Sequence, residues 1–364
     1  MTKDDLPSPA LLIDIEALEA NIAKMSQHAR AHSLQLRPHA KTHKCPEVAR
    51  RQIAAGASGI CCATIREAEA MAAAGIAGLL ITSEMVGRNR LERLVALTRQ
   101  QPDTMSVVDN PLHAEQLNDA AEAAGITLNV LIDIDPNLHR TGIQAGAAAL
   151  ELAEKIDRLP HLNLQGLQCY SGISSHVVGF AERRKHSEAA MTPALETFFT
   201  IRQKGLPVEI MSGGSTGTYN IDTALDGMTE LQTGSYVFMD VDYRSIGGAS
   251  GAVYDDFANA LFVRATVISA NHAGLATIDA GFKAFATDRP HLPEIRGIEG
   301  VKYHFAGDEH GILDIKEASR EIKLGDALEF IVPHCDPNVN LFDKAYVVRD
   351  EEIVDAWNIA RGYN

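Results

Sequence analysis

Short hydrophobic runs alternate with amphipathic segments over the first two thirds of the chain. Each run is five to nine residues long and apolar, which is typical of strands buried in a parallel sheet. The runs occupy eight ranges: 34–41, 59–64, 78–83, 104–109, 128–134, 162–170, 208–212 and 231–237. Apolar residues recur at helical spacing between them, as in 46–55, 67–74, 88–99, 112–124 and 145–159. Eight strands alternating with helices predict a (β/α)₈ barrel of the TIM type over residues 15–250. A doubly wound open sheet is the alternative, but the absence of a Gly-rich first turn favours closure.

The pattern changes after about residue 250. Short runs rich in β-branched residues follow one another, separated by turn clusters such as Asn-His-Ala-Gly. They occupy 262–269, 274–279, 301–305, 312–315, 327–333 and 346–349. We therefore expect a second, mainly β domain at 251–364. Residues 1–14 would belong to it, because 9–14 read as one more strand that could pair there.

The first run has a polar face as well as an apolar one. Its apolar positions are Leu34, Leu36, Pro38 and Ala40, and its polar positions are Gln35, Arg37, His39 and Lys41. If the apolar face packs against helices, Lys41 and His39 point into one partly enclosed space. Burial and nearby positive charge favour a neutral amine, which Schiff-base chemistry with a carbonyl cofactor requires. A solvated basic edge strand is the alternative reading of this segment.

Composition excludes some partners. The net charge of −15 argues against nucleic acid and anionic membranes, which bind clustered Lys and Arg. The five cysteines form no C-x-x-C pair, and no apolar run reaches 18 residues. The N-terminal residues also lack an apolar signal region. We expect a soluble cytoplasmic protein that acts on a small molecule.

Polar and glycine-rich segments follow the last two predicted barrel strands. Ser212–Thr218 reads Ser-Gly-Gly-Ser-Thr-Gly-Thr, and Gly234-Ser235 lies beyond it. Glycines let the backbone approach an anion, and hydroxyl and backbone N–H groups donate to it. In a barrel these loops share one mouth with Lys41. A phosphate cradle and an amine at one mouth indicate a pyridoxal-phosphate site.

The segment Arg37–Lys44 resembles the cofactor-lysine motif of the D-threonine aldolase and D-serine dehydratase family, pyridoxal 5'-phosphate enzymes of the alanine-racemase-like fold. The resemblance extends over most of the chain, through residues 9–14, 213–218, 234–240 and 334–337. It implies that Lys41 holds the cofactor as a Schiff base, that Arg140 and Tyr170 flank its ring, and that the protein is a homodimer. The phosphate would be held by Ser215, Thr216, Gly217, Thr218, Gly234 and Ser235.

A second motif, His334-Cys335-Asp336, corresponds to the divalent-metal site of that family. In a strand, His334 and Asp336 would share a face and Cys335 would point away. An aspartate is a hard oxygen ligand suited to Mn²⁺ or Mg²⁺, which favours the aldolases of the family. Cys335 as a ligand would instead indicate zinc and dehydration, and Asp308 could join the site as a nearby acidic group. The resemblance also suggests that His176 contacts the substrate hydroxyl, where it would accept a proton as a catalytic residue.

The resemblance therefore implies retro-aldol cleavage of D-threonine and other D-3-hydroxy amino acids to glycine and an aldehyde. One alternative is a D-serine or D-threo-3-hydroxyaspartate dehydratase. Another is a pyridoxal-phosphate carrier without turnover, although such carriers are a bare barrel. A racemase is a third, and would need a second acid/base group, for which Tyr254 and Tyr303 are the candidates.

Overall fold

A computed structural model describes residues 1–363, and the chain divides into two compact units. The barrel unit comprises residues 24–41, 46–234 and Tyr363. The β unit comprises residues 1–23, 42–45 and 235–362. Residues 235–250, which the sequence assigns to the barrel, pack with the β unit because Val241 lies in a buried cluster with Leu12 and Phe262.

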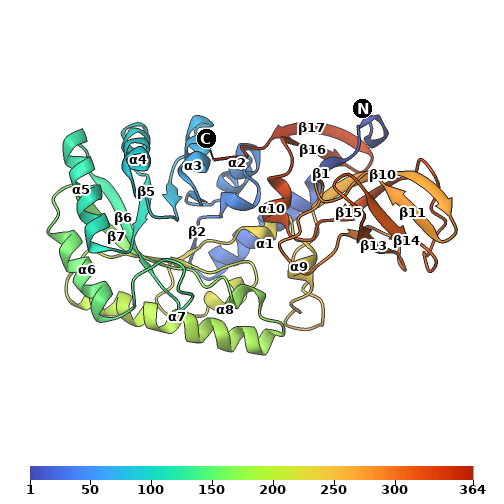
Figure 1. Cartoon of the computed structure of the whole chain (residues 1–364). Helices are drawn as coiled ribbons and strands as arrows, with labels where there is room; N and C mark the ends of the chain where they lie inside the picture. Colours follow the sequence, from blue (N-terminus) through green and yellow to red (C-terminus); the bar gives the residue numbers. More distant parts are fainter. Residues whose placement is uncertain (364) are drawn as a thin grey trace. The chain divides into compact units, whose positions relative to one another are not determined.

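The barrel unit contains eight parallel strands (Figure 1). They are β2 (Gln35–Leu36), β3 (Ile60–Cys62), β4 (Leu79–Ile81), β5 (Met105–Val108), β6 (Leu128–Ile134), β7 (Leu162–Cys169), β8 (Ile210–Gly213) and β9 (Glu230–Leu231). Their order is β2-β9-β8-β7-β6-β5-β4-β3. A parallel bridge between His39 and Cys61 joins the segment after β2 to β3, and so closes the barrel. The predicted (β/α)₈ fold is confirmed.

Helices connect these strands and surround them (Figure 1). They are α2 (Pro46–Ala54), α3 (Ile65–Ala73), α4 (Arg88–Gln100), α5 (Pro111–Ala124), α6 (Ala147–Asp157), α7 (Phe180–Gln203) and the short α8 (Tyr219–Asp222). Capping residues in the local sequence set the first residues of α3 and α5. Thr64 Oγ1 accepts the Glu67 N–H at the start of α3, and Asn110 caps α5 ahead of Pro111 in its first turn.

The barrel interior has an apolar and a polar part. One buried cluster consists of Cys61, Leu80, Met105, Val107 and Leu131. The second set is polar and equally buried, and comes from β6 to β9 and the residue after β9: Asp133, Gln168, Ser212, Glu230 and Gln232. Buried polar groups need hydrogen-bond partners inside the protein. The side chains of this polar part can therefore be held in defined positions.

Two predicted barrel strands are shorter in the structure than in the sequence analysis. Only Gln35–Leu36 of the run 34–41 and Glu230–Leu231 near the run 231–237 form strands. Lys41 lies in a 3₁₀ turn, Ala40–Thr42, and Ser235–Val237 forms another. The predicted alternation of an apolar and a polar face fails in this segment. Every residue from Leu36 to Ala40 is buried, so the segment has no exposed face.

The β unit is built on one mixed sheet in which the N-terminal strand is central. Its strands are β1 (Ala10–Asp14), β10 (Leu261–His272), β11 (Leu275–Ile278), β12 (Glu294–Ile295), β13 (Lys302–Phe305), β14 (Gly311–Asp314), β15 (Ala327–Ile331), β16 (Lys344–Arg349) and β17 (Glu352–Asn358). β1 lies antiparallel to β10 and parallel to β16. The predicted pairing of the N-terminal segment with the later strands is confirmed.

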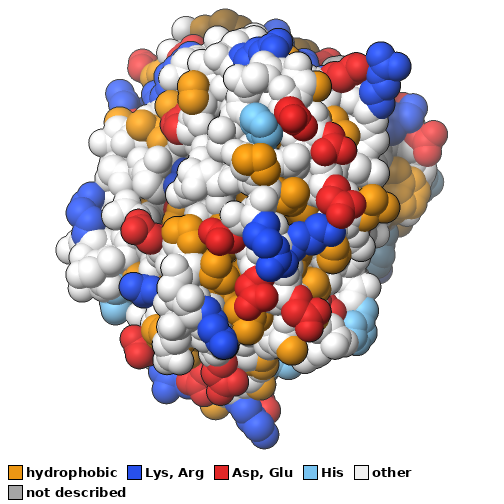
Figure 2. Space-filling model, turned by 90° about the vertical axis from the view of Figure 1, so that its left-hand side faces the viewer, with side chains coloured by type: hydrophobic (Ala, Val, Ile, Leu, Met, Phe, Trp, Pro, Cys, Tyr) orange, Lys and Arg blue, Asp and Glu red, His pale blue; other side chains and the backbone are white. Residues whose placement is uncertain are grey.

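Three helices complete this description: α1 (Ile15–Ala31), which continues from the β unit into the barrel unit, and the short α9 (Val241–Arg244) and α10 (Cys335–Val339). On the face shown in Figure 2, acidic and basic side chains are interspersed with hydrophobic ones, without a large area of one sign. Within residues 1–363, no helix combines the length and apolar character needed to span a bilayer.

Candidate functional site

Lys41 lines a cavity of about 270 Å³ in the barrel unit. The other lining residues come from the carboxyl ends of several strands: His39, Ala63, Thr82, Ser83, Glu84, Arg140, Thr141, Gln168, Tyr170 and Gln232. Active sites of (β/α)₈ barrels occupy this end of the strands. Three residues predicted around the cofactor, Lys41, Arg140 and Tyr170, therefore share one cavity. The Arg140 guanidinium carbon lies 5.5 Å from the centroid of the Tyr170 ring.

His39 is held in one tautomer beside Lys41. Its Nδ1 accepts the backbone N–H of Lys41 at 3.3 Å, and its Nε2 lies 3.1 Å from Thr82 Oγ1. The Thr82 hydroxyl donates to Cys62 O, so His39 Nε2 carries the proton that it shares with Thr82. These contacts describe a neutral imidazole that orients the backbone of Lys41.

Sequence reasoning missed two neighbouring carboxyl groups, of which Glu84 lines this cavity and Asp133 lies beside Glu84. Glu84 follows β4, and Asp133 lies near the end of β6. Burial, together with the nearby carboxylates of Asp133 and Asp109, raises the pKa of Glu84 to about 7. Both oxygens of Asp133 accept hydrogen bonds, from Gln168 Nε2 and Thr141 Oγ1, at 2.9 Å each. A proton shared by the pair therefore resides on Glu84. The sequence signal that could have identified Glu84 and Asp133 is their position at the ends of predicted strands.

The glycine-rich loop after β8 forms a compact turn that leads into α8. Gly214 has φ +77°, and a Cβ at this position would lie 3.0 Å from Leu231 Cδ2. Ser215 Oγ lies 2.9 Å from Thr218 Oγ1, which donates to Asp222 Oδ2 at 2.5 Å. The residues that resembled a phosphate loop thus form one hydrogen-bonded turn, and the backbone conformation at Gly214 favours glycine.

Buried charged groups support this loop from behind. Ser187 Oγ donates to Asp222 Oδ1 at 2.6 Å, and burial raises the pKa of Asp222 to about 6. Arg183 is fully buried, and its Nε donates to Gly217 O at 2.8 Å. Gly234 is the last residue of this stretch in the barrel unit, whereas Ser235 belongs to the β unit.

His334 and Asp336 lie at the start of α10 and not in a strand. His334 is the extended residue before the helix, and Asp336 is the second residue within it. The prediction that both share one face of a strand is therefore wrong, because Pro337 and the capping interactions around Asp240 favour a helical turn. Asp240 Oδ2 accepts the Cys335 N–H at 2.8 Å.

The surroundings of these two residues still suit a metal ligand. His334 Nδ1 lies 2.7 Å from Asp288 Oδ2, so Nε2 is the ring nitrogen that a metal would have to use. Asp336 Oδ1 has longer contacts, 3.4 Å to Ser235 Oγ and 3.5 Å to Cys335 Sγ. Cys335 is fully buried, and burial beside Asp240 raises the pKa of its thiol. Among residues 1–363, no three His, Cys, Asp or Glu side chains form a cluster that could hold a metal.

Other predicted residues lie elsewhere. His176 is in a 3₁₀ turn, Ser174–His176, and is not among the side chains that line the Lys41 cavity. Asp308 is an exposed turn residue whose carboxylate lies 4.0 Å from Lys283 Nζ. Tyr303 and Tyr254 are buried in the β unit, and the Tyr303 hydroxyl donates to Ala280 O at 2.9 Å. A buried, hydrogen-bonded tyrosine is a poor match for the second acid/base group of a racemase.

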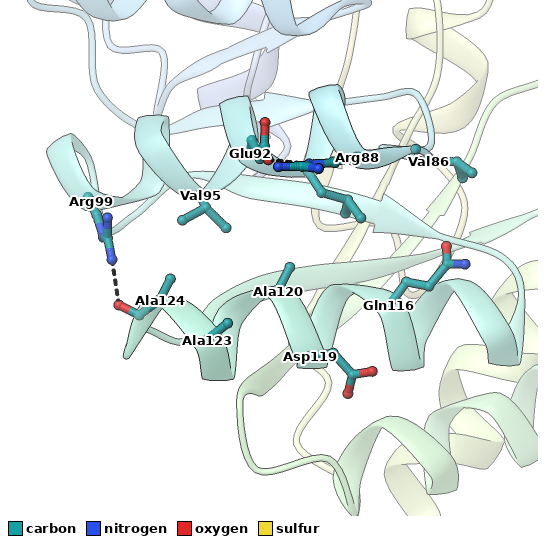
Figure 3. Close-up of a pocket in the computed structure, with 12 residues that line it drawn as sticks. Val86, Arg88, Glu92, Val95, Arg99, Gln116, Asp119, Ala120, Ala123 and Ala124 are labelled. Carbon is teal, nitrogen blue, oxygen red and sulfur yellow. Dashed lines mark hydrogen bonds and ion pairs between the residues drawn. The ribbon is translucent and has the colours of Figure 1, made fainter.

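A larger groove of about 710 Å³ lies on the outside of the barrel, between α4 and α5. Val95, Ala120 and Ala123 face it, and Arg99 donates to Ala124 O at one end (Figure 3). Its charged pair, Arg88 and Glu92, is an exposed ion pair at helical spacing. This groove lacks the convergent polar groups of the Lys41 cavity.

The chain matches two family models. Residues 13–242 match the alanine racemase N-terminal domain, and residues 260–348 match a serine dehydratase domain. A D-threonine aldolase from Arthrobacter is 38% identical over 98% of this chain and 93% of its own length. A 3-hydroxy-D-aspartate aldolase from Paracoccus denitrificans is 35% identical over 100% of this chain and 94% of its own length.

Two further matches define the range of activities among relatives. The crystal structure of D-threonine aldolase from Filomicrobium marinum superposes with a TM-score of 0.94 at 36% identity, covering 99% of this chain and 97% of that one. A D-threo-3-hydroxyaspartate dehydratase from Delftia is 32% identical over 98% of both chains. Lyases that act on D-3-hydroxy amino acids and their analogues thus share this chain's two-domain organisation.

Proposed function

Because this chain belongs to the alanine-racemase-like family that joins an alanine racemase N-terminal domain to a serine dehydratase domain, we propose that it is a D-threonine aldolase. It would cleave D-threonine and related D-3-hydroxy amino acids to glycine and an aldehyde. The observation that carries the proposal is the cavity in which Lys41, Arg140 and Tyr170 meet at the strand ends of the barrel. The aldolase relatives, similar over nearly their whole length, support it.

The residues of the barrel unit fit pyridoxal phosphate. Lys41 supplies an amine inside a cavity, and Gly214 has the positive φ and close surroundings that favour glycine in the turn after β8. When bound, the cofactor draws electrons from the α-carbon of an amino acid attached to it. In this proposal Lys41 would hold the cofactor through its side-chain amine. Arg140 and Tyr170 hold the ring, and residues 215–218, with Gly234 and Ser235, hold the phosphate.

We further propose that His334 and Asp336 bind a divalent cation, Mn²⁺ or Mg²⁺. One imidazole nitrogen and one carboxylate form a donor set with open positions, and a carboxylate favours these hard cations. Asp288 holds the proton of His334 on Nδ1, which keeps Nε2 free to coordinate. A cation there would supply positive charge for the β-hydroxyl of the substrate. His176 is proposed to accept the proton of that hydroxyl.

One experiment distinguishes the main candidates. The purified protein is incubated with pyridoxal phosphate and Mn²⁺ against D-threonine and D-serine in parallel, with and without EDTA. Glycine and acetaldehyde from D-threonine, lost on addition of EDTA, support a metal-dependent aldolase. Pyruvate and ammonia from D-serine would instead show a dehydratase, the activity suggested by the Delftia relative. A protein that binds the cofactor without forming either product would be a carrier.

The resemblance further leads us to propose a homodimer in the cytoplasm. Size-exclusion chromatography with light scattering measures the mass directly, and a dimer has twice the 39.3 kDa of one chain. A monomeric mass at micromolar concentration would contradict this part of the proposal.

A further inference from the structure

A second cavity, of about 350 Å³, adjoins the Lys41 cavity at the carboxyl ends of β3 and β4. Ala63 and Ser83 line both cavities, and Ser83 Oγ donates to Ala63 O at 2.7 Å. Most of the other lining residues come from the N-terminal turns of α3 and α4, two neighbouring helices of the barrel unit (Figure 1). A ligand in this second cavity would therefore lie next to the site proposed for the cofactor.

The charged side chains that line the second cavity are all basic. Arg66, Arg90 and Arg93 line it, whereas no Asp or Glu within residues 1–363 does, and we call it the arginine cavity. Glu69 accepts hydrogen bonds from Arg93 Nε and Nη2, at 2.8 and 2.6 Å. These bonds, together with the charges of Arg93 and Arg66, hold the pKa of Glu69 below its usual value. One carboxylate thus serves two arginines, and the cavity keeps a net positive charge.

The arginine cavity also offers hydrogen-bond donors. Arg66 Nε is buried and has no hydrogen-bond partner within residues 1–363. A buried donor without a partner is costly, and an acceptor on a ligand would remove that cost. Thr64 Oγ1 accepts the Glu67 N–H, so its own hydroxyl proton can be donated, and Asn89 adds a side-chain amide.

The start of α4 adds positive potential to this cavity. The helix begins Arg88-Asn89-Arg90, has no acidic residue in its first turn, and follows Gly87, which supplies no side-chain cap. The free N–H groups at a helix N-terminus carry partial positive charge, so arginines at this end are unfavourable unless an anion lies nearby. A bound anion would offset this cost for Arg90.

We propose that Arg66, Arg90 and Arg93 bind the carboxylate groups of a small organic acid in this cavity. Guanidinium groups pair with both oxygens of a carboxylate, and Arg93 keeps Nη1 for such a ligand because Glu69 takes only Nε and Nη2. The carboxylate can come from two sources. One is a free dicarboxylate, and the other is a second carboxylate on a substrate held in the adjoining Lys41 cavity.

Titration with malonate, a dicarboxylate without an amine, tests the site. Calorimetry measures its dissociation constant for the protein saturated with pyridoxal phosphate, at an ionic strength held constant with NaCl. We expect Arg66→Gln/Arg90→Gln to bind malonate at least about tenfold more weakly than the native protein, because hydrogen bonds to charged groups are lost. Arg88→Gln/Arg99→Gln is the matched control, since it removes the same charge from exposed positions of α4 outside the cavity.

Equal affinities of the native protein and Arg66→Gln/Arg90→Gln would overturn the inference, as would the absence of malonate binding to the native protein at millimolar concentrations. Thermal unfolding provides a second measurement. Malonate should raise the Tm of the native protein and of the control, and leave that of Arg66→Gln/Arg90→Gln unchanged. If this double variant does not fold, Arg90→Gln alone, at an exposed position, carries the same test.

Kinetics distinguish the two sources, and this arm alone rests on the proposed function. If the substrate carries the carboxylate, Arg66→Gln/Arg90→Gln should lose at least about tenfold in kcat/KM for D-3-hydroxyaspartate and keep its value for D-threonine. If a free dicarboxylate binds, both values should stay unchanged. An equal loss for both substrates would show that the arginines support the barrel mouth and would overturn the site. A native protein inactive on both substrates would contradict the proposed function, and the malonate titration would still decide the site.

Discussion

Lys41 is the single residue on which the proposed chemistry depends. Replacing it with alanine should abolish the absorbance of lysine-bound pyridoxal phosphate, because no other lysine lines the cavity among the described residues. The absorbance spectrum after gel filtration measures this directly. Lys204→Ala, at the exposed end of α7, should keep the band. A band that survives in Lys41→Ala would show that another residue holds the cofactor.

Glu84 gives the protein a distinct pH dependence. Its pKa is raised from 4.5 to about 7, so the folded protein holds this proton at pH values where the unfolded chain has lost it. Its contribution to stability is thus present below about pH 4.5 and is lost as the pH rises towards 7. In Glu84→Gln we expect the fall in unfolding free energy between about pH 4.5 and 7 to be smaller by about 1–2 kcal/mol. The value is modest because the Glu84 side chain is partly exposed.

Urea unfolding of both proteins at pH 5, 6, 7 and 8 measures the difference. Equal slopes of the unfolding free energy against pH in the native protein and Glu84→Gln would show that Glu84 has an ordinary pKa. Asp109 and Asp133 face Glu84, and Lys41, His39 and Arg140 line the same cavity, so the comparison must keep all of them unchanged.

At the scale of single residues, the sequence analysis identified site residues by their motifs and missed the buried polar residues in the interior of the barrel. Lys41, Arg140 and Tyr170 were predicted, because short motifs and strand ends mark them. Gln168 and Gln232 were not, since a buried glutamine in a strand has the same sequence signal whether it fills space or orders a hydrogen-bond chain. Their alignment is seen only in the structure, where the register of β7 beside β8 places Gln168 opposite Ser212, and Gln232 donates to both.

At the scale of elements, the turn after β8 has a backbone conformation that favours glycine at one position, Gly214. Gly214→Ala should both strain φ and press a Cβ against Leu231 and Asp222, 3.0 and 3.1 Å away. We expect a loss of about 1–3 kcal/mol in stability and weaker retention of the cofactor. Thermal unfolding and dialysis against buffer measure the two effects.

Gly146→Ala provides the matched control for this variant. Gly146 also has a positive φ, +84°, but a Cβ there meets nothing within 4 Å. The difference between the two variants therefore isolates the effect of the close packing. Equal losses in both would show that the turn is not tightly packed.

The central position of β1 makes it sensitive to truncation of its core side chains. Leu12 is fully buried between β10 and β16, so Leu12→Ala should cost about 2–5 kcal/mol. The exposed Leu324 is the control, and Leu324→Ala should change stability by less than about 0.5 kcal/mol. Differential scanning calorimetry checks both. A small loss in Leu12→Ala would show that β1 is peripheral to folding.

The elements also show where sequence reasoning succeeded and failed. The long apolar runs predicted strands well, and 128–134 matches β6 at both ends. Two-residue strands such as β9 are too short for a hydrophobic periodicity to be detected in the sequence. The motif at His334 was considered as a strand, in which His334 and Asp336 would share a face, but a helix begins at Cys335, whose N–H donates to Asp240.

At the scale of the whole molecule, the proposed cofactor residues other than Ser235 belong to one unit and the proposed metal ligands to the other. The cofactor residues up to Gly234 lie in the barrel unit, whereas His334 and Asp336 lie in the β unit. Asp336→Ala should therefore keep its lysine-bound cofactor and its absorbance, while cleavage of D-threonine falls at least about 100-fold. Parallel measurement of the spectrum and of acetaldehyde release checks this. Undiminished cleavage in the presence of EDTA would remove Asp336 from the mechanism.

The position of β1 has a consequence for how the protein is made. Leu12 pairs with Phe262 and Tyr346, so this strand is translated long before its partners. At roughly 5–20 residues per second, the 250 residues that separate Leu12 from Phe262 take about 12–50 s to translate. During that interval the barrel strands can already pair, while this apolar strand stays without its partners. Chaperone contact during translation should therefore concentrate on this strand.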